Sequence, residues 1–493
     1  MSGNLHMFVM AAPLVGALTV NLAGRASRKA VLPLVLGFLT LSLVAALGTM
    51  AGVLEHGAFT YTVGNWQPPF GIELRIDHLS SLMLVLVSAV ALIASFASLQ
   101  SVAKDLADRQ HHFFTLYLIL VAGLHGLILT ADAFNLYVLL EITSITTYGL
   151  IAMGRGRAPL SSFNYIIMGS IGACFYLLGV GYLYILTGTL NMADIAARLP
   201  QVNGTVAVAT AFAFMLVGLW IKMAFFPLHG WLPRAYNDAP IGAGVLVAPL
   251  MTKVTIYLML RVMFSVFSPQ YEFFQHPDVQ NLVVWGAALG IICASALALG
   301  QRDLRRMLTY IIVAEVGYMV GGVWLANGTG LTGAVLHIVN DALMTLCLFL
   351  VAAAIISRNG SLAFDRLQGL YRRMPWTMAG FTLGAFAMIG VPPTCGFFSK
   401  WYLILGGIEA RQWPYVVALV FSSLVNAVLF FRIIEIAYFR GGKGHGHDDH
   451  GPVTEAPAMI LAPLLVSAAA LVLVGLATGP LVSNLIAQFV PVF

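Results

Sequence analysis

A succession of fourteen apolar runs, each about as long as a membrane-spanning helix, is the feature that most limits how this chain can fold. A helix needs about 20 mostly apolar residues to cross the hydrocarbon core of a bilayer. Only 9% of the 493 residues are charged, which excludes an ordinary soluble surface. The sequence predicts an all-α polytopic membrane protein with spans at 5–22, 31–54, 78–99, 112–130, 133–153, 162–187, 205–227, 242–266, 280–299, 307–326, 329–356, 377–407, 413–439 and 457–477.

The basic residues predict the orientation of these spans. Seventeen of the 25 Lys and Arg residues lie in one set of alternate loops, whereas the other set holds Arg75, Arg198 and Arg411, with Arg261 at a helix end. Cytoplasmic loops are enriched in Lys and Arg, and an even number of spans returns the chain to its starting side. We therefore expect both termini outside. The formal net charge of +5 reflects this topology and does not indicate a nucleic-acid partner.

Cofactor and metal motifs are absent from the sequence. Cys174, Cys293, Cys347 and Cys395 lie in apolar runs without a CxxC pair, so we expect small buried side chains and neither an iron–sulfur site nor a disulfide framework. In the stretch GGKGHGHDDHGP, three histidines could bind a metal ion, but a flexible cytoplasmic loop is the favoured interpretation; they are His445, His447 and His450. No cofactor or metal site is predicted.

Ionisable residues within the apolar runs are the candidate functional residues. The set comprises Glu141, Lys222, Lys253, His337, Asp341 and Lys400. An ionised group at the bilayer centre costs about 2.5–3.5 kcal/mol on insertion scales, so such residues are expected to face a wet or paired interior and to act there. The alternative for the lysines is a side chain that extends to the membrane interface.

Two of these groups suggest proton chemistry. A buried Glu141 and a buried lysine shift each other's titration, so a proton can move between them. His337, Asp341 and Thr345 follow at i, i+4 and i+8 and therefore share one face of the eleventh span. We expect Asp341 to hold His337 in one tautomer; a merely hydrogen-bonded core histidine is the alternative.

Two spans are predicted to be broken. Pro227 follows Lys222 by five residues, and the twin Pro392 and Pro393 precede Lys400, so both segments lose helical hydrogen bonds at membrane depth. These seventh and twelfth spans run in opposite directions. Inverted repeats with broken helices are a common way to build ion sites at the membrane midplane.

The segment WIKMAFFPLHGWLPRAYNDAP, followed by MTKVTIYLMLR, closely resembles the antiporter-like proton-translocating subunits shared by complex I, group 4 membrane-bound hydrogenases and Mrp cation/proton antiporters. QRDLRRMLTY and GVPPTCGFFSK also fit. The runs NWQPPFGIELRIDHLSSLML, FNLYVLLEI and YIIVAEVGYM look most like the D type of Mrp subunit. The resemblance implies fourteen spanning helices with two inverted five-helix repeats, formed by helices four to eight and nine to thirteen.

The same resemblance assigns expected roles. Glu141 matches the family's essential glutamate, Lys222 its proton-switching lysine and Lys253 the intermediate lysine, while His337 matches the first histidine of the eleventh helix and Lys400 the terminal lysine. Family members often show a second histidine and then a lysine where this chain has Asp341 and Thr345. Proton transfer between Lys253 and Lys400 must therefore run through Asp341 or through water, or be weaker.

Four segments are expected from this resemblance: residues 1–111 with helices 1–3, 112–266 and 279–440 with the two repeats, and 441–493 with the His-rich loop and helix 14. The expected function is proton relay in a Mrp-type Na⁺/H⁺ antiporter, with a complex I-like oxidoreductase or a membrane-bound hydrogenase as the alternative. The chain carries no redox centre motif of its own, although it could serve a redox-driven complex.

Expected partners are other membrane subunits, including a paralogous antiporter-like subunit and small membrane subunits, together with protons and, as a second candidate ion, Na⁺. The expected location is the cytoplasmic membrane of a bacterium or archaeon. A free-standing carrier of an organic solute and a structural subunit with vestigial channels are the competing classes.

Overall fold

The computed structural model describes residues 4–202, 204–439 and 454–491. The His-rich stretch lies outside the described residues. Within them, thirteen helices are long and apolar enough to cross a membrane. They are α1 (Leu5–Ala26), α2 (Val31–His56), α3 (His78–Asp105), α4 (Gln110–Leu129), α5 (Ala133–Ala152), α6 (Ala158–Thr187), α8 (Val206–Met223), α10 (Ile241–Arg261), α12 (Pro277–Leu299), α13 (Leu304–Trp324), α14 (Gly328–Asn359), α18 (Trp413–Ile434) and α19 (Ala458–Leu476).

The remaining span is the broken twelfth, which consists of α16 (Pro375–Ile389) and α17 (Cys395–Glu409). The prediction of about fourteen spans with breaks in the seventh and twelfth is confirmed. Four short helices lie between the spans, namely α7 (Met192–Arg198), α9 (Leu232–Asp238), α11 (Glu272–Gln275) and α15 (Leu370–Arg373), and α20 (Thr478–Leu481) follows the last span. The all-helical expectation missed one small hairpin, in which β1 (Phe59–Thr62) pairs antiparallel with β2 (Glu73–Ile76).

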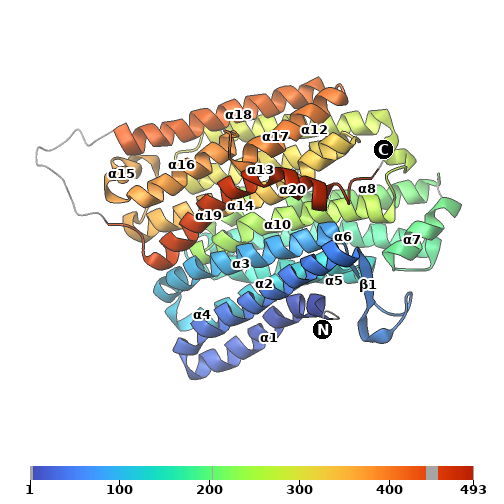
Figure 1. The fold of residues 1–493 in the computed structure, drawn as a ribbon, viewed down its shortest axis with the longest axis horizontal. Helices are drawn as coiled ribbons and strands as arrows, with labels where there is room; N and C mark the ends of the chain where they lie inside the picture. Colours follow the sequence, from blue (N-terminus) through green and yellow to red (C-terminus); the bar gives the residue numbers. More distant parts are fainter. Residues whose placement is uncertain (1–3, 203, 440–453, 492–493) are drawn as a thin grey trace, which may run out of the picture.

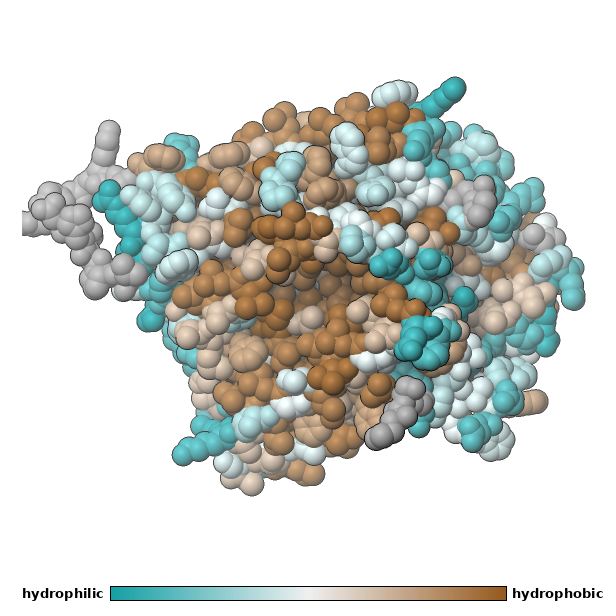
Figure 2. Space-filling model, viewed as in Figure 1, coloured by the Kyte–Doolittle hydropathy of each residue, from teal (hydrophilic) through white to brown (hydrophobic). Residues whose placement is uncertain are grey.

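The spans run side by side along one direction (Figure 1). Figure 2 shows, on the face in view, apolar residues across the middle of the bundle and hydrophilic residues at both ends, the pattern expected of a protein embedded in lipid. Large apolar side chains are exposed on the spans, for example Ile185 of α6 at 81% and Leu282 of α12 at 74%. The expectation that all four cysteines are buried is confirmed for Cys347 and Cys395 but wrong for Cys174, which is exposed on α6, and Cys293 is half-buried. An apolar residue in a span can equally face lipid.

Two helices form the centre of the bundle. α10 and α14 are buried along their membrane-spanning lengths, whereas most other spans expose one side. Lys253 lies on α10, and His337 and Asp341 lie on α14. These candidate residues are therefore far from the lipid-facing surface.

The helices α5 and α13 begin in the same way. Asp132 and Asp303 each cap the first turn by accepting the backbone N–H three residues later. Each aspartate also forms a β-bridge with the chain that follows the next spanning helix, Asp132 with Asn191 and Asp303 with Ala363. The two parts of the chain therefore repeat one local arrangement.

The breaks in the seventh and twelfth spans are also alike. Ala224 and Gly390 end α8 and α16 with left-handed backbone, at φ values of 60° and 92°. In both breaks the next residue donates its N–H to the carbonyl oxygen five residues earlier, at 2.9 Å. Pro227 and Pro393 follow the left-handed residues by three positions. The break is therefore a second repeated element, and it frees carbonyl groups for other donors.

An ion pair joins the start of α3 to the end of α10. The Asp77 carboxylate accepts the Ser80 N–H as a helix cap and receives two bonds from the Arg261 guanidinium, at 2.7 and 2.5 Å. Burial alone would raise the pKa of Asp77, but Arg261 and the Ser80 N–H lower it to about 2. Asp77 is therefore ionised at physiological pH, and the pair fixes the ends of two spans together.

We expect Asp77→Asn to destabilise the protein by about 3 kcal/mol, because removing one partner of a buried pair leaves the other charge uncompensated. The measurement is thermal unfolding of the purified protein in detergent. The matched control is Asp108→Asn, since Asp108 forms an exposed pair with Arg28 at 2.7 Å; its expected loss is within about 1 kcal/mol. Equal destabilisation by the two changes would contradict the assignment.

Candidate functional site

Lys222, near the end of α8, points toward α5. Its ammonium group lies 3.0 Å from Glu141 Oε1 and donates to Ser144 Oγ at 2.7 Å. Lys222 is 5% exposed, whereas a quarter of the Glu141 side chain is accessible. The lysine is the penultimate residue of α8 and lies two positions before the left-handed Ala224 that begins the break.

A second pair lies at the centre of the bundle. Lys253 on α10 is 2.7 Å from Asp341 Oδ2 on α14, and both side chains are fully buried. Thr345 donates to the other carboxylate oxygen of Asp341 at 3.0 Å. The expectation that Asp341 orients His337 therefore differs from the structure: the closest charge to Asp341 is the lysine of the neighbouring helix.

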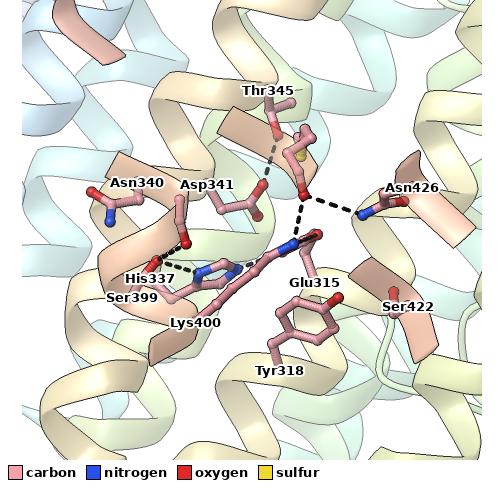
Figure 3. Close-up of polar contacts among 12 residues, drawn as sticks. Glu315, Tyr318, His337, Asn340, Asp341, Thr345, Ser399, Lys400, Ser422 and Asn426 are labelled. Carbon is pink, nitrogen blue, oxygen red and sulfur yellow. Dashed lines mark hydrogen bonds and ion pairs between the residues drawn. The ribbon is translucent and has the colours of Figure 1, made fainter. Parts of the chain in front are cut away.

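His337 instead contacts Glu315 and Ser399, as Figure 3 shows. Its Nε2 lies 2.5 Å from Glu315 Oε2 on α13, and its Nδ1 lies 2.9 Å from Ser399 Oγ on α17. Because the Ser399 hydroxyl donates to the Gly396 carbonyl at 3.3 Å, its oxygen is oriented to accept from Nδ1. In the tautomer that matches this donation, Nδ1 carries the proton and Nε2 is free to exchange a proton with Glu315.

Lys400, on α17, lies in the same cluster as His337 and Glu315. Its ammonium group donates to the Met388 carbonyl at 2.5 Å, lies 4.0 Å from Glu315 Oε1 and lies 5.1 Å from the centre of the Tyr318 ring. The Met388 carbonyl is one of those freed by the break, and Asn426 also donates to it at 3.3 Å. Lys400 is therefore held beside the break and within reach of a carboxylate.

The six predicted site residues fall into three groups. Glu141 lies with Lys222, Asp341 with Lys253, and His337 with Lys400. None of the three lysines extends to the interface, because each is at most 5% exposed; they are Lys222, Lys253 and Lys400.

Glu315 was missed among the site residues. It is an acid twelve residues into an apolar span, so the criterion that selected Glu141 would also have selected it.

These groups can store and transfer protons. Each lysine has one carboxylate nearby, which offsets the cost of burying the ammonium group. Two interacting titratable groups share their protons, so a change at one alters the other. No group of three or more His, Cys, Asp or Glu side chains that could hold a metal ion occurs among residues 4–202, 204–439 and 454–491.

Comparisons with known proteins agree with this fold. NADH-quinone oxidoreductase subunit N of Desulforudis audaxviator is 41% identical and covers 100% of this chain and 99% of its own. The D subunit of the Na⁺/H⁺ antiporter of Alkalihalophilus pseudofirmus is 30% identical over 91% of this chain and 88% of its own. A chain of the membrane-bound sulfane sulfur reductase, an archaeal respiratory membrane complex, is 28% identical, with a TM-score of 0.90 over 99% of this chain and 98% of its own.

The model of a protein family described as NADH:quinone oxidoreductase/Mrp antiporter, transmembrane, matches residues 130–426. This match spans both helix breaks and every candidate residue named above. The chain therefore belongs to the NADH:quinone oxidoreductase/Mrp antiporter family and is an antiporter-like membrane subunit.

Proposed function

We propose that this chain relays protons through the membrane as a subunit of a redox-driven, complex I-like respiratory complex. The observation that supports the relay most directly is the set of lysines buried in the bundle, each with a carboxylate from a neighbouring helix. Buried pairs of this kind are a costly way to obtain stability, since apolar residues would serve as well or better. Proton transfer gives them a reason to be present.

The proposed relay depends on switching charges. When the carboxylate beside a buried ammonium group is neutralised or moves away, the unpaired ammonium is disfavoured and releases its proton to the next acceptor. We order the acceptors as Glu141, Lys222, Lys253, His337 and Lys400, with water between the groups. In this order a change at Glu141 is transmitted from one pair to the next.

Asp341 provides the proposed link in the middle of the relay. The resemblance places a histidine and then a lysine on the eleventh helix, where this chain has Asp341 and Thr345. Asp341 is in direct contact with Lys253 and shares α14 with His337 one turn away. We infer that the carboxylate receives protons from Lys253 and that the Thr345 hydroxyl stabilises its charged form.

The surface around Glu141 supports a neighbouring membrane subunit. A carboxylate with a quarter of its side chain accessible lies on α5 among exposed apolar residues, including Ile142 and Ile145. Contact of this group with lipid would be costly, whereas a covering subunit could solvate it. We propose that other membrane subunits, including a paralogous antiporter-like one and small membrane subunits, assemble with this chain.

The relatives favour the oxidoreductase over the antiporter. The 41% identity with an oxidoreductase subunit N exceeds the 30% identity with the D subunit of an antiporter. The assignment to the D type of Mrp subunit, expected from the sequence, is therefore not confirmed, and Na⁺/H⁺ antiport remains the second candidate function.

We also propose a bacterial or archaeal cytoplasmic membrane location, both termini outside, and repeat boundaries at residues 112–266 and 279–440.

We expect Lys222→Ala and Glu141→Gln each to abolish proton transport while leaving the complex assembled, because each removes one member of the first pair. The measurement uses inside-out membrane vesicles with a pH-sensitive dye, energised in one arm by NADH and in the other by a NaCl pulse. Copurification through a tag on this chain identifies the partner subunits in the same preparations.

The control is Lys29→Ala, a change of an exposed basic residue outside the bundle, which should leave transport unchanged. Acidification driven by NADH supports the redox-driven assignment, whereas a response to NaCl alone supports antiport. Full transport by both Lys222→Ala and Glu141→Gln would exclude the relay and favour a structural subunit.

For the central pair, we expect Asp341→Asn to lower both the yield of assembled complex and transport, because it leaves the Lys253 ammonium buried and unpaired. Breaking a buried pair costs about 3–5 kcal/mol. The double change Lys253→Met with Asp341→Leu should restore assembly, since it removes both charges, but not transport. Yield and unfolding temperature are compared with dye-monitored transport; restored transport in the double variant would contradict a role in the relay.

A further inference from the structure

We propose that Glu315 is a proton-carrying carboxylate of the second repeat, equivalent in role to Glu141 in the first. This inference rests on the proposed relay function. It adds a group between His337 and Lys400 in the order given above. Its support comes from the two repeated elements of the fold and from the contacts of the carboxylate.

The helix breaks relate Lys400 to Lys222 through one backbone position. Lys222 precedes the left-handed residue Ala224 by two positions, and the residue two positions before the left-handed Gly390 is Met388. The ammonium group of Lys400 is bonded to the Met388 carbonyl at 2.5 Å. The two lysines come from opposite sides of their breaks, and the ammonium group of Lys400 lies beside the backbone position that is equivalent to Lys222.

The helix caps place Glu315 near the position equivalent to Glu141. Glu141 follows the capping residue Asp132 by nine positions, and Glu315 follows Asp303 by twelve. A difference of three residues is about one helical turn, so the two acids occupy the same face of their helices. Each faces the lysine of the broken span in its own repeat, at 3.0 Å for Lys222 and 4.0 Å for Lys400.

The contacts of Glu315 fit a group that transfers protons better than a group that only orients His337. The residue is fully buried, Oε2 contacts His337, and Oε1 has no hydrogen-bond partner within the described part of the chain. His337 is already oriented through Nδ1 by Ser399. Oε1 lies 4.0 Å from the ammonium group of Lys400.

The transfer step can be written with full proton balance. The His337 imidazolium gives its Nε2 proton to Oε2, so one N–H bond breaks and one O–H bond forms, and neutral histidine keeps its Nδ1 proton. Rotation of the protonated carboxyl group then turns its O–H from His337 toward neutral Lys400, and the proton passes to Nζ, so the O–H bond breaks and an N–H bond forms. The carboxylate is regenerated, and the same steps operate in the reverse direction.

The test compares Glu315→Gln and Glu315→Asp in the intact complex in inside-out vesicles, with NADH and NaCl arms as above. The glutamine keeps the size of the side chain and can still hydrogen-bond His337, but it cannot carry a proton. We expect Glu315→Gln to lose transport to the level of Lys222→Ala with assembly intact, and Glu315→Asp to regain part of it. The matched control is Asp132→Asn, an amide substitution at a buried capping carboxylate, which should retain transport.

A spectroscopic readout separates transfer from a structural role. Infrared difference spectra of the energised complex should contain a carboxyl C=O band that is missing in Glu315→Gln and shifted in Glu315→Asp. Retained transport in Glu315→Gln, with Lys222→Ala inactive, would overturn this inference and leave the relay intact. Retained transport in both variants would overturn the relay itself.

Discussion

The burial of three ammonium groups inside an apolar bundle is the constraint on which the rest of this structure depends. Each lysine is at most 5% exposed, and each finds its carboxylate on a neighbouring helix: α5 faces α8, α14 faces α10, and α13 faces α17. An unpaired charge in such surroundings is strongly unfavourable. The pairs therefore help to determine which helices lie together, besides whatever chemistry they perform.

The distance between the two charges of each pair determines how much energy is needed to separate them. With an effective dielectric constant of about 20, two unit charges attract by roughly 5 kcal/mol at 3 Å and about 4 kcal/mol at 4 Å. Moving one charge across 100 mV corresponds to about 2.3 kcal/mol. The energy of forming or losing a pair is therefore larger than the electrical work per proton, whereas the energy change when the two charges of a pair move apart by 1 Å is smaller. Small movements of Lys400 between Met388 and Glu315 fall within the range that a membrane potential can influence.

The sequence allowed much of the fold to be predicted, because span length, proline positions and loop charge are local properties. The two breaks and the candidate lysines followed from such patterns. The partners of His337 and Asp341 could not be predicted in this way. These two residues, four apart on one helix, were expected to contact each other, whereas α10 and α13 supply closer charges. Which neighbouring helix faces a given residue depends on packing between distant segments, and a single sequence does not contain that information in local form.

Asp341 and Thr345, at the two positions where the resemblance implied a histidine and a lysine, are consistent with the charges counted over the whole site. The site holds three lysines, Lys222, Lys253 and Lys400, and three acids, Glu141, Asp341 and Glu315. With His337 neutral, these charges balance. A lysine at the position of Thr345 would add a fourth cation directly beside Lys253, where Thr345 Oγ1 now lies 3.5 Å from the ammonium group. Thr345 and Asp341 therefore have complementary effects: one avoids a cation and the other supplies an anion, so the centre of the bundle stays neutral while retaining a group that can accept a proton.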